Sequence, residues 1–371
     1  MSKTYFIKNS KTIDAGSVPL PVGNKKYKIG SLFSGCGGMD LGFIGDFTFL
    51  GNHYDKNPFE IVFSNDIFEQ AADCYESNLH HNVIRKSICE VTDDELPAEP
   101  IDVLLGGFPC QTFSLAGKRK GLSDPRGQLY LEMIRLIKHY HPRVFVAENV
   151  DGIRNSRKDR HGESVDKSAL DTILEDFEKA GYAVQYKVLN AADFGVPQQR
   201  RRVIIIGIRK DLGDQRDICY PLENHSEIQT PGIPLWVTAR DAIDDLWDKV
   251  NLTSISNHTV RDISKAKFYP GRKMQGNNQI KADKPSPTIR AEHHGNIEAH
   301  YRSNNPGNPD DMSGWRRLSV RECARLQSFP DDYRFVCSAS MAYKMIGNAV
   351  PPVMAWNIAR AVLSILEKIE K

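Results

Sequence analysis

The sequence lacks the features that would place it outside the class of ordinary globular proteins. It has no run of about 18 apolar residues, and the lysine-rich first 30 residues contain no apolar segment, so we expect neither a membrane span nor a secretory signal. Its seven cysteines form no C-x-x-C pair and are odd in number, which argues against a disulfide framework and a zinc site. We therefore expect a cytoplasmic protein without a bound metal.

The chain also lacks an excess of charge of either sign. Its 371 residues carry 49 Lys and Arg against 47 Asp and Glu, a net charge of +2. The charge is unevenly placed, because residues 261–290 hold eight basic and two acidic residues whereas residues 89–102 hold six acidic residues and no basic one. Near-neutrality of the whole chain therefore does not exclude a nucleic-acid partner.

Short apolar runs alternate with helical patterns over the first half of the chain. This alternation predicts an α/β fold with a parallel sheet and helices on both faces. A terminal helix that packs back on the sheet is predicted by the apolar pattern from Val353 to Leu366. We expect a loosely ordered lead-in over residues 1–28, an α/β domain formed by 29–211 and 341–371, and an irregular, loop-rich domain over 212–340.

A glycine-rich turn, Phe33-Ser-Gly-Cys-Gly-Gly38, follows the first apolar run and begins a helical pattern. Its spacing matches neither the dinucleotide-binding fingerprint nor the phosphate-binding P-loop, so a nucleoside-type ligand without phosphates fits better. By itself the turn is equally compatible with a tight structural turn. Asp66 ends the second apolar run, where α/β proteins commonly hold ribose hydroxyls, although a helix cap is an equal alternative.

Three later motifs place reactive side chains at the ends of predicted strands. Cys110 follows the third run, within Pro-Cys-Gln, and Glu148 ends the fourth. Arg200 and Arg202 enter the last strand and share one face by pleat alternation. A thiol, a carboxyl and two guanidinium groups at one sheet edge suit nucleophilic catalysis with a general acid. The alternatives are a buried structural cysteine and a solvated basic strand entry.

Together, and in this order, the motifs resemble those of the DNA (cytosine-5) methyltransferases of bacterial restriction-modification type. The matching blocks are Phe-Ser-Gly-Cys-Gly-Gly, Pro-Cys-Gln, Glu-Asn-Val, Gln-x-Arg-x-Arg, Arg-Glu-Cys-Ala-Arg and Gly-Asn-Ala-Val-Pro, and the likeness covers nearly the whole chain apart from the middle region. The resemblance implies a Rossmann-like methyltransferase sheet with helices on both faces and a smaller, loop-rich target-recognition domain over 212–340.

The resemblance also implies an activity. Such an enzyme moves a methyl group from S-adenosylmethionine to carbon 5 of a cytosine flipped out of duplex DNA, through a covalent bond between a cysteine and carbon 6. It implies a double-stranded DNA partner and functional pairing with a restriction endonuclease of the same specificity, and we expect a monomer.

Roles for single residues come from the same motif matches. The implied catalytic residues are Cys110, Glu148, Arg200 and Arg202. The implied cofactor-binding residues are Phe33, Ser34, Gly35, Gly37, Gly38, Asp66, Ile67, Ser87, Ile88, Pro109, Asn348 and Ala349. The implied DNA-binding residues are Gln111, Ser114, Lys118, Arg126, Arg272, Lys273, Thr288 and Arg290. Ser87 departs from the family pattern, which usually has an acidic residue that reaches the adenine amino group.

Three alternative functions are weighed against this one. One is the tRNA-methylating branch of the same family, which the sizeable middle region disfavours. A second is a catalytically silent DNA-binding relative, which has no use for Cys110 together with Glu148 and both arginines. A third is a cysteine hydrolase, for which no histidine stands in a supporting context.

Overall fold

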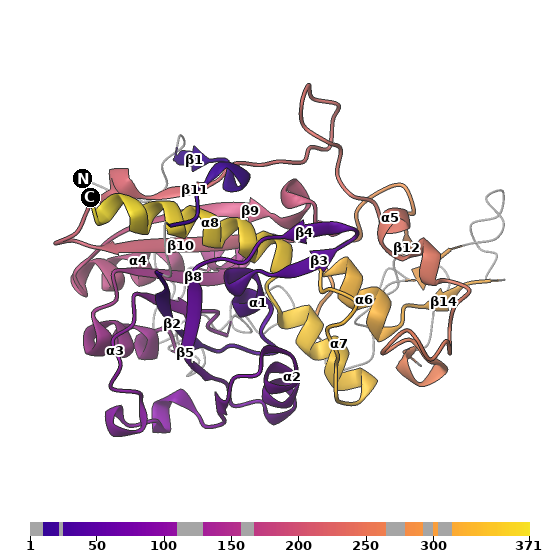
Figure 1. Ribbon diagram of the computed structural model, residues 1–371, viewed down its shortest axis with the longest axis horizontal. Helices are drawn as coiled ribbons and strands as arrows, with labels where there is room; N and C mark the ends of the chain where they lie inside the picture. The colour runs from indigo at the N-terminus through magenta and orange to yellow at the C-terminus, as the bar shows by residue number, and fades with distance from the viewer. Residues whose placement is uncertain are drawn as a thin grey trace.

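A seven-stranded mixed sheet forms the centre of the computed structural model (Figure 1). The structure describes residues 10–21, 25–109, 129–156, 167–264, 279–291, 300–302 and 314–371. The strand order is β6-β5-β2-β7-β8-β10-β9. These strands span β2 Tyr27–Leu32, β5 Phe59–Asn65, β6 Val83–Ile84, β7 Val103–Gly106, β8 Val144–Val150, β9 Tyr182–Asn190 and β10 Arg201–Arg209.

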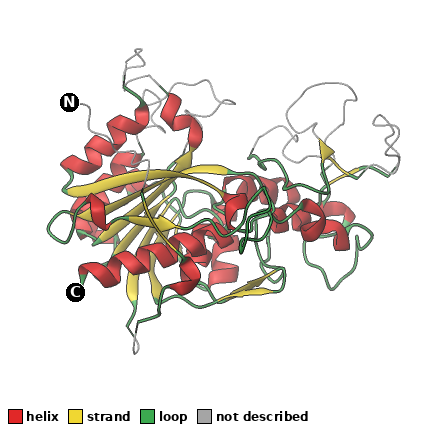
Figure 2. Cartoon of the chain, turned by 90° about the horizontal axis from the view of Figure 1, so that it is seen from above, coloured by secondary structure: helices red, strands yellow, loops and turns green. Residues whose placement is uncertain are grey.

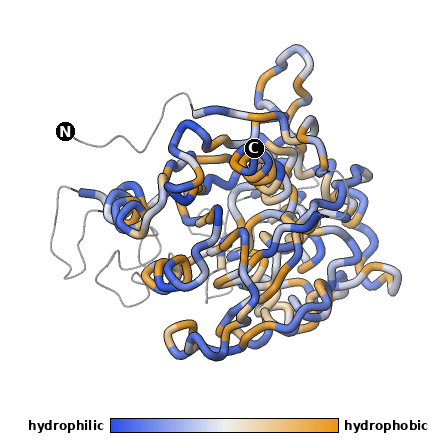
Figure 3. Tube along the Cα trace, turned by 60° about the vertical axis from the view of Figure 1, so that its left-hand side comes forward, coloured by the Kyte–Doolittle hydropathy of each residue, from blue (hydrophilic) through white to orange (hydrophobic). Residues whose placement is uncertain are grey.

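Helices cover both faces of this sheet, which confirms the predicted fold class (Figure 2). One face packs against α1 (Gly38–Ile44) and α8 (Pro352–Ile369), and the other against α3 (Tyr130–Tyr140) and α4 (Ala169–Lys179). Successive residues of a strand face opposite layers, as with Val103 and Leu104 of β7, so the inner strands are apolar on both sides. The tube coloured by hydropathy shows the C-terminal helix as a largely apolar segment (Figure 3).

One strand of the sheet runs against the others. β10 pairs antiparallel with both β8 and β9, whereas the remaining neighbours pair in parallel. The connection from Asn190 to Arg201 is too short for the crossover helix that a parallel pair needs, so β9 and β10 form a hairpin. The predicted parallel pairing is therefore confirmed for β2, β5, β7 and β8, and β10 makes the whole sheet mixed.

The N-terminal segment is more ordered over residues 10–21 than the expected loose lead-in. β1 (Lys11–Ile13) pairs in parallel with β11 (Cys219–Pro221), and a 3-10 helix, η1 (Ala15–Ser17), follows. The buried guanidinium of Arg360 on α8 donates hydrogen bonds to the carbonyl oxygens of Ala15, at 3.0 Å, and Val18. Local periodicity does not reveal such a strand, because its partner lies about 200 residues later in the sequence.

The terminal helix that the sequence predicts is α8, which packs closely on α1. A Cβ atom at Gly42 of α1 would lie 2.4 Å from Cβ of Ala355, so glycine is what permits this approach. By length and composition the stretch Ala339–Ile369 is apolar enough to cross a membrane. However, 89% of its apolar window is buried inside the protein, as in a core helix.

The middle of the chain forms smaller elements beside the sheet (Figure 1). Its described elements include α5 (Ala239–Ile243), α6 (Val320–Leu326) and a three-stranded sheet of β12 (Gln279–Ile280), β13 (His300–Tyr301) and β14 (Arg316–Arg317). α7 (Ala339–Asn348) leads back to α8. β11 packs with β1 and α8, so the segment up to Pro221 lies with the α/β layers, although the sequence places it in the second domain.

Candidate active site

The strand order creates a topological switch point between β2 and β7. The chain continues from β2 to β5 on one side, and β7 lies on the other side. In open α/β sheets, ligands bind outside the carboxyl ends of the strands at such a point. The glycine-rich turn follows β2, and Gly107 to Pro109 follow β7, so both motifs meet at this edge.

The glycine-rich turn bends sharply because several of its residues adopt the left-handed backbone conformation. Phe33, Gly35 and Gly37 have φ angles of 54°, 55° and 81°. A Cβ atom at Gly38 would lie 2.4 Å from the carbonyl oxygen of Val350, which only glycine avoids. Among the described residues, apart from Gly35 and its two chain neighbours, no atom lies within 4 Å of the position of a Cβ atom at Gly35, so this part of the turn is open. A non-glycine residue held at positive φ, as Phe33 is here, is typical of functional sites.

Asp66 joins the end of β5 to this turn. Its carboxylate accepts hydrogen bonds from the backbone N–H of Gly35 at 2.7 Å and from that of Phe68 at 2.8 Å. Burial raises the pKa of Asp66, and these backbone donors together with the charge of Lys344 act in the opposite direction. Each carboxylate oxygen keeps a lone pair for a further donor such as a ribose hydroxyl. The neighbouring side chain of Ile67 is 69% exposed and offers an apolar surface beside the carboxylate.

The remaining cofactor candidates come from three other segments near this edge. Ser87 is half-buried and precedes a 3-10 helix that begins with the buried Ile88. The side-chain amide of Asn65 donates to the carbonyl oxygens of Ile84 and Lys86 at 2.8 Å each, which holds this segment against β5. Half-buried Pro109 follows β7.

The end of α7 reaches the glycine-rich turn. Cβ of Ala349 lies 3.2 Å from the position of a Cβ atom at Gly38. The carbonyl oxygen of Ala349 accepts a hydrogen bond of 2.5 Å from the side chain of Gln327. Asn348, the last residue of α7, is exposed. The structure thus brings Ala349 to the turn, whereas the side chain of Asn348 has no hydrogen bond or ion pair among the described residues.

Glu148 and Arg202 form a buried ion pair across neighbouring strands. Nε of Arg202 on β10 lies 2.7 Å from Oε1 of Glu148 on β8, and each residue is only 8% exposed. Oε2 of Glu148 lies 3.6 Å from the position of a Cβ atom at Gly107, so it faces the segment that leads to Cys110. The side-chain amide of Asn149 donates to the carbonyl oxygen of Phe108 at 3.2 Å and ties the two strand ends together.

Arg200 does not share a site with Arg202, although the sequence predicts that both lie on one face of the strand. It lies one residue before β10, where the pleat of that strand does not yet apply. Its buried guanidinium donates to the carbonyl oxygens of Ile289, at 3.1 Å, and Gly347, at 2.9 Å. Sequence reasoning missed Gln198, which is fully buried and donates to the carbonyl oxygen of Leu326 at 3.1 Å. The signal was its place in the Gln-x-Arg-x-Arg block.

The DNA-binding candidates are described only in part. The hydroxyl of Thr288 donates to the carbonyl oxygen of Gln199 at 2.6 Å, and Arg290 is exposed. Other candidates lie outside the described residues, namely Cys110, Gln111, Ser114, Lys118, Arg126, Arg272 and Lys273. Within the described ranges, no group of three or more His, Cys, Asp or Glu side chains could hold a metal ion.

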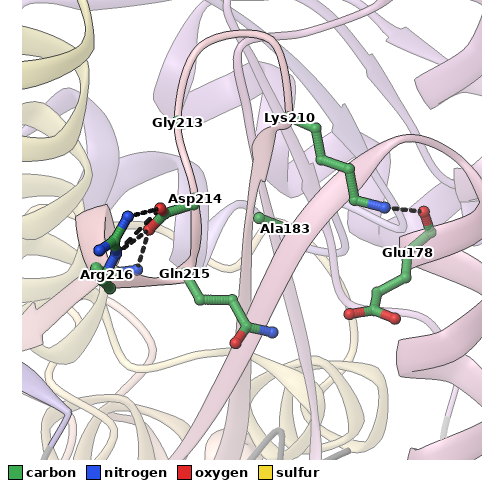
Figure 4. A pocket seen from close by; sticks show the side chains of 7 residues that line it. All are labelled: Glu178, Ala183, Lys210, Gly213, Asp214, Gln215 and Arg216. Carbon is green, nitrogen blue, oxygen red and sulfur yellow. Dashed lines mark hydrogen bonds and ion pairs between the residues drawn. The ribbon is translucent and has the colours of Figure 1, made fainter.

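A hollow of about 580 Å³ lies at the opposite edge of the sheet (Figure 4). It is lined mainly by the loop after β10. Ile208, near the end of β10, pairs with Val144, the first residue of β8, so this loop lies at the amino end of β8 and not at its carboxyl end. Its charged groups have partners, because Lys210 donates to the carbonyl oxygen of Glu178 and Arg216 pairs with Asp214. This hollow is therefore separate from the site at the carboxyl ends.

Comparison with known proteins agrees with this geometry. Residues 27–364 match the model of the family described as C-5 cytosine-specific DNA methylase. The type II methyltransferase M.NgoFVII of Neisseria gonorrhoeae is 35% identical over 356 residues, which cover 92% of this chain and 88% of the relative. M.FnuDI of Fusobacterium nucleatum is also 35% identical, over 93% of this chain and 97% of the relative. The solved structure of the methyltransferase EhMeth of Entamoeba histolytica has the same fold, with a TM-score of 0.64 at 17% identity over 94% of this chain and 100% of that one.

Proposed function

The chain belongs to the C-5 cytosine-specific DNA methylase family, and we propose that Cys110 and Glu148 perform its methyl transfer from S-adenosylmethionine. The enzyme methylates carbon 5 of cytosine in DNA, as a type II modification methyltransferase. The observation that carries the assignment of residues is the buried Glu148–Arg202 pair, whose second carboxylate oxygen faces the segment before Cys110.

The cytosine ring needs activation because its carbon 5 is a weak nucleophile. The thiolate of Cys110 adds to carbon 6 while Glu148 gives a proton to N3, which makes carbon 5 the nucleophilic end of an enamine. The bound cofactor would supply its methyl group to carbon 5, and its methyl–sulfonium bond would break to leave a neutral thioether. Water then takes the proton from carbon 5, the bond between carbon 6 and the cysteine sulfur breaks, and the proton on N3 returns to Glu148, which frees the thiolate and 5-methylcytosine. Arg202 orients Glu148 through Oε1, which leaves Oε2 directed at the entering base. Arg202 also places a positive charge near the site, which favours the thiolate form of a cysteine.

The residues at the switch point fit S-adenosylmethionine. When bound, this cofactor supplies an electrophilic methyl group on a sulfonium. Asp66 would hold the ribose hydroxyls, and the exposed side chain of Ile67 would cover the adenine. Phe33 and the glycine-rich turn would receive the rest of the molecule, since Gly35 faces open space. Ser87 replaces the usual acidic partner of the adenine amino group and gives a weaker contact there.

The remaining cofactor-binding assignments follow the same edge of the sheet. We assign Ser34, Gly37, Gly38, Ile88, Pro109, Asn348 and Ala349 to the walls of this pocket. The catalytic domain would comprise residues 29–211 and 341–371, with β11 beside it, and the target-recognition domain would comprise the rest of 212–340. Its α5, α6 and three-stranded sheet lie beside the large sheet, on the right in Figure 1.

Double-stranded DNA is the proposed substrate, and a restriction endonuclease of the same specificity is the proposed functional partner. DNA contacts are assigned to Gln111, Ser114, Lys118, Arg126, Arg272, Lys273, Thr288 and Arg290, which carry five positive charges. Cationic side chains of this kind bind phosphates and position a protein on DNA. We further propose that the enzyme acts as a monomer in the cytoplasm.

Covalent trapping tests the assignment of Cys110. The protein is incubated with duplex DNA that contains 5-fluorocytosine and with S-adenosylmethionine, and a denaturing gel then shows whether a stable complex forms. We expect a complex with the wild type and with Cys89→Ser, which changes an exposed thiol that is assigned no role, and none with Cys110→Ser. A complex that survives Cys110→Ser would overturn the assignment. Methyl transfer to tRNA in place of DNA would overturn the proposed substrate.

A further inference from the structure

The Gln-x-Arg-x-Arg block holds the backbone of one residue from two sides. Oε1 of Gln198 accepts a hydrogen bond of 3.0 Å from the N–H of Ile289. The guanidinium of Arg200 donates to the carbonyl oxygen of the same residue at 3.1 Å. Gln198 is fully buried and Arg200 is 1% exposed, so water does not compete for these bonds. Both backbone groups of Ile289 are therefore bound by side chains only two residues apart.

The contact extends along the backbone on either side of this clamp. The N–H of Gln199 donates to the carbonyl oxygen of Ser286 at 2.8 Å, and the N–H of Ser286 donates to the carbonyl oxygen of Pro197 at 2.9 Å. Thr288 adds its hydroxyl bond to Gln199. Residues 286–289 thus run alongside residues 197–200, directly before the strand that carries Arg202.

A third segment meets at the same place. Arg200 also donates to the carbonyl oxygen of Gly347 in the last turn of α7. A Cβ atom at Gly347 would lie 2.5 Å from the carbonyl carbon of Arg290 and 2.6 Å from the backbone nitrogen of Ala291, so the two backbones touch directly. Ala349, two residues further on, contacts the glycine-rich turn. Arg200 and Gly347 therefore connect the start of β10, residues 286–291 and the proposed cofactor pocket.

We infer that Gln198 and Arg200 are positioning residues. They hold residues 286–290, the proposed DNA-contacting segment, in register with β10, the strand that carries Arg202. Arg202, in contrast, pairs with Glu148 at the proposed reaction centre. This inference rests on the proposed function, because it takes DNA to lie against Thr288 and Arg290. A planar guanidinium reaches two carbonyl oxygens of different segments at once, whereas the single ammonium of lysine cannot reproduce this fork. Loss of these two hydrogen bonds frees the proposed DNA-contacting segment but leaves Glu148 and Arg202 in place.

Steady-state kinetics on unmethylated bacteriophage DNA separate positioning from catalysis. We expect Arg200→Lys to raise KM for DNA at least tenfold while kcat stays within about threefold of the wild type. Arg202→Lys should instead lower kcat at least a hundredfold. Arg209→Lys, at the other end of β10, pairs with exposed Asp211 and should change neither parameter. If Arg200→Lys lowered kcat as far as Arg202→Lys at an unchanged KM, Arg200 would be catalytic and the inference would be wrong.

Hydrogen exchange gives a readout that does not depend on activity. The amide of Ile289 should be protected in the wild-type protein and should exchange at least tenfold faster in Gln198→Met, a variant of similar volume that lacks the acceptor. Arg209→Lys should leave its protection unchanged. Fast exchange in the wild type would overturn the clamp even if methyl transfer were normal. Absence of wild-type methyl transfer alongside a protected amide would overturn the proposed function instead, and the two failures are thus distinct.

Discussion

The Glu148–Arg202 ion pair allows stability and catalysis to be measured apart. The two side chains approach to 2.7 Å and are almost fully buried, so replacing one of them leaves an uncompensated charge inside the protein. Removing one partner of a buried pair costs about 3–5 kcal/mol, whereas replacing both by neutral groups of similar volume is often neutral or stabilising. We therefore expect Glu148→Gln and Arg202→Met each to lose about 3 kcal/mol of unfolding free energy. The double variant should recover most of this loss.

Catalysis should not follow the same pattern. Glu148 is the proposed proton donor to N3, and general acids of this kind contribute rate factors of about 10²–10⁴. Glu148→Gln should lose methyl transfer by a factor in that range, and the double variant should stay as slow although it is stable again. A stable but inactive protein would show that the carboxyl acts on the substrate as well as on the fold.

Urea unfolding and transfer of radiolabelled methyl groups to DNA measure the two quantities in the same four proteins. The exposed pair of Arg85 with Glu76, at 2.6 Å, supplies a matched control. Exposed pairs contribute about 0–1 kcal/mol, so Arg85→Met should alter stability little and leave methyl transfer unchanged. Recovery of methyl transfer together with stability in the double variant would refute the catalytic role of Glu148. If each single replacement lowered the free energy of unfolding by less than about 1 kcal/mol, the conclusion that Glu148 and Arg202 form a buried ion pair would be refuted.

Three further variants test the packing and the buried charges. Gly42→Ala should lose about 1–3 kcal/mol in urea unfolding, because its new Cβ would lie 2.4 Å from Cβ of Ala355, and a loss no larger than that of Gly16→Ala, which has more room, would contradict this. Burial raises the pKa of Asp40 from 3.8 to about 6, so its contribution to stability is present below pH 4 and is lost as the pH rises through 6. Asp40→Asn should therefore gain about 3 kcal/mol relative to the wild type between pH 4 and pH 7, and a difference that does not vary with pH would refute the burial of this carboxyl. Arg360→Met removes hydrogen bonds to two carbonyl oxygens of the N-terminal segment, so residues 10–18 should become sensitive to limited proteolysis while the α/β core resists, and unchanged cleavage would contradict this.

The local pattern of the sequence predicts the elements of the fold well where each strand and helix is long and apolar. Alternating apolar runs locate β2, β7 and β8, and the apolar stripe up to Leu366 locates α8. These signals are strong because burial on both faces makes the central strands continuously apolar. The direction of β10 depends instead on the length of the preceding connection, and the pairing of β1 with β11 joins segments about 200 residues apart. Neither property appears in a short window of sequence.

The order of motifs predicts the candidate site better than the spacing within a motif does. Asp66, Glu148 and the glycine-rich turn each stand at the carboxyl end of a strand, and the fold brings these ends to one edge. Topology alone is enough for this result, because parallel strands end on the same side of a sheet. The contacts of Arg202 follow in the same way, because β10 pairs directly with β8.

The alternation of Gln198, Arg200 and Arg202 shows why spacing alone misleads. In an extended chain, residues two apart point the same way only while the backbone keeps one pleat and one set of neighbours. Here the segment up to Gln199 runs beside Ser286, and from Arg201 onward the chain pairs with β8 and β9. Gln198 and Arg200 therefore contact Ile289, whereas Arg202 contacts Glu148 on β8. A period of two establishes that a segment is extended, and the neighbouring strands decide which of its residues share a site.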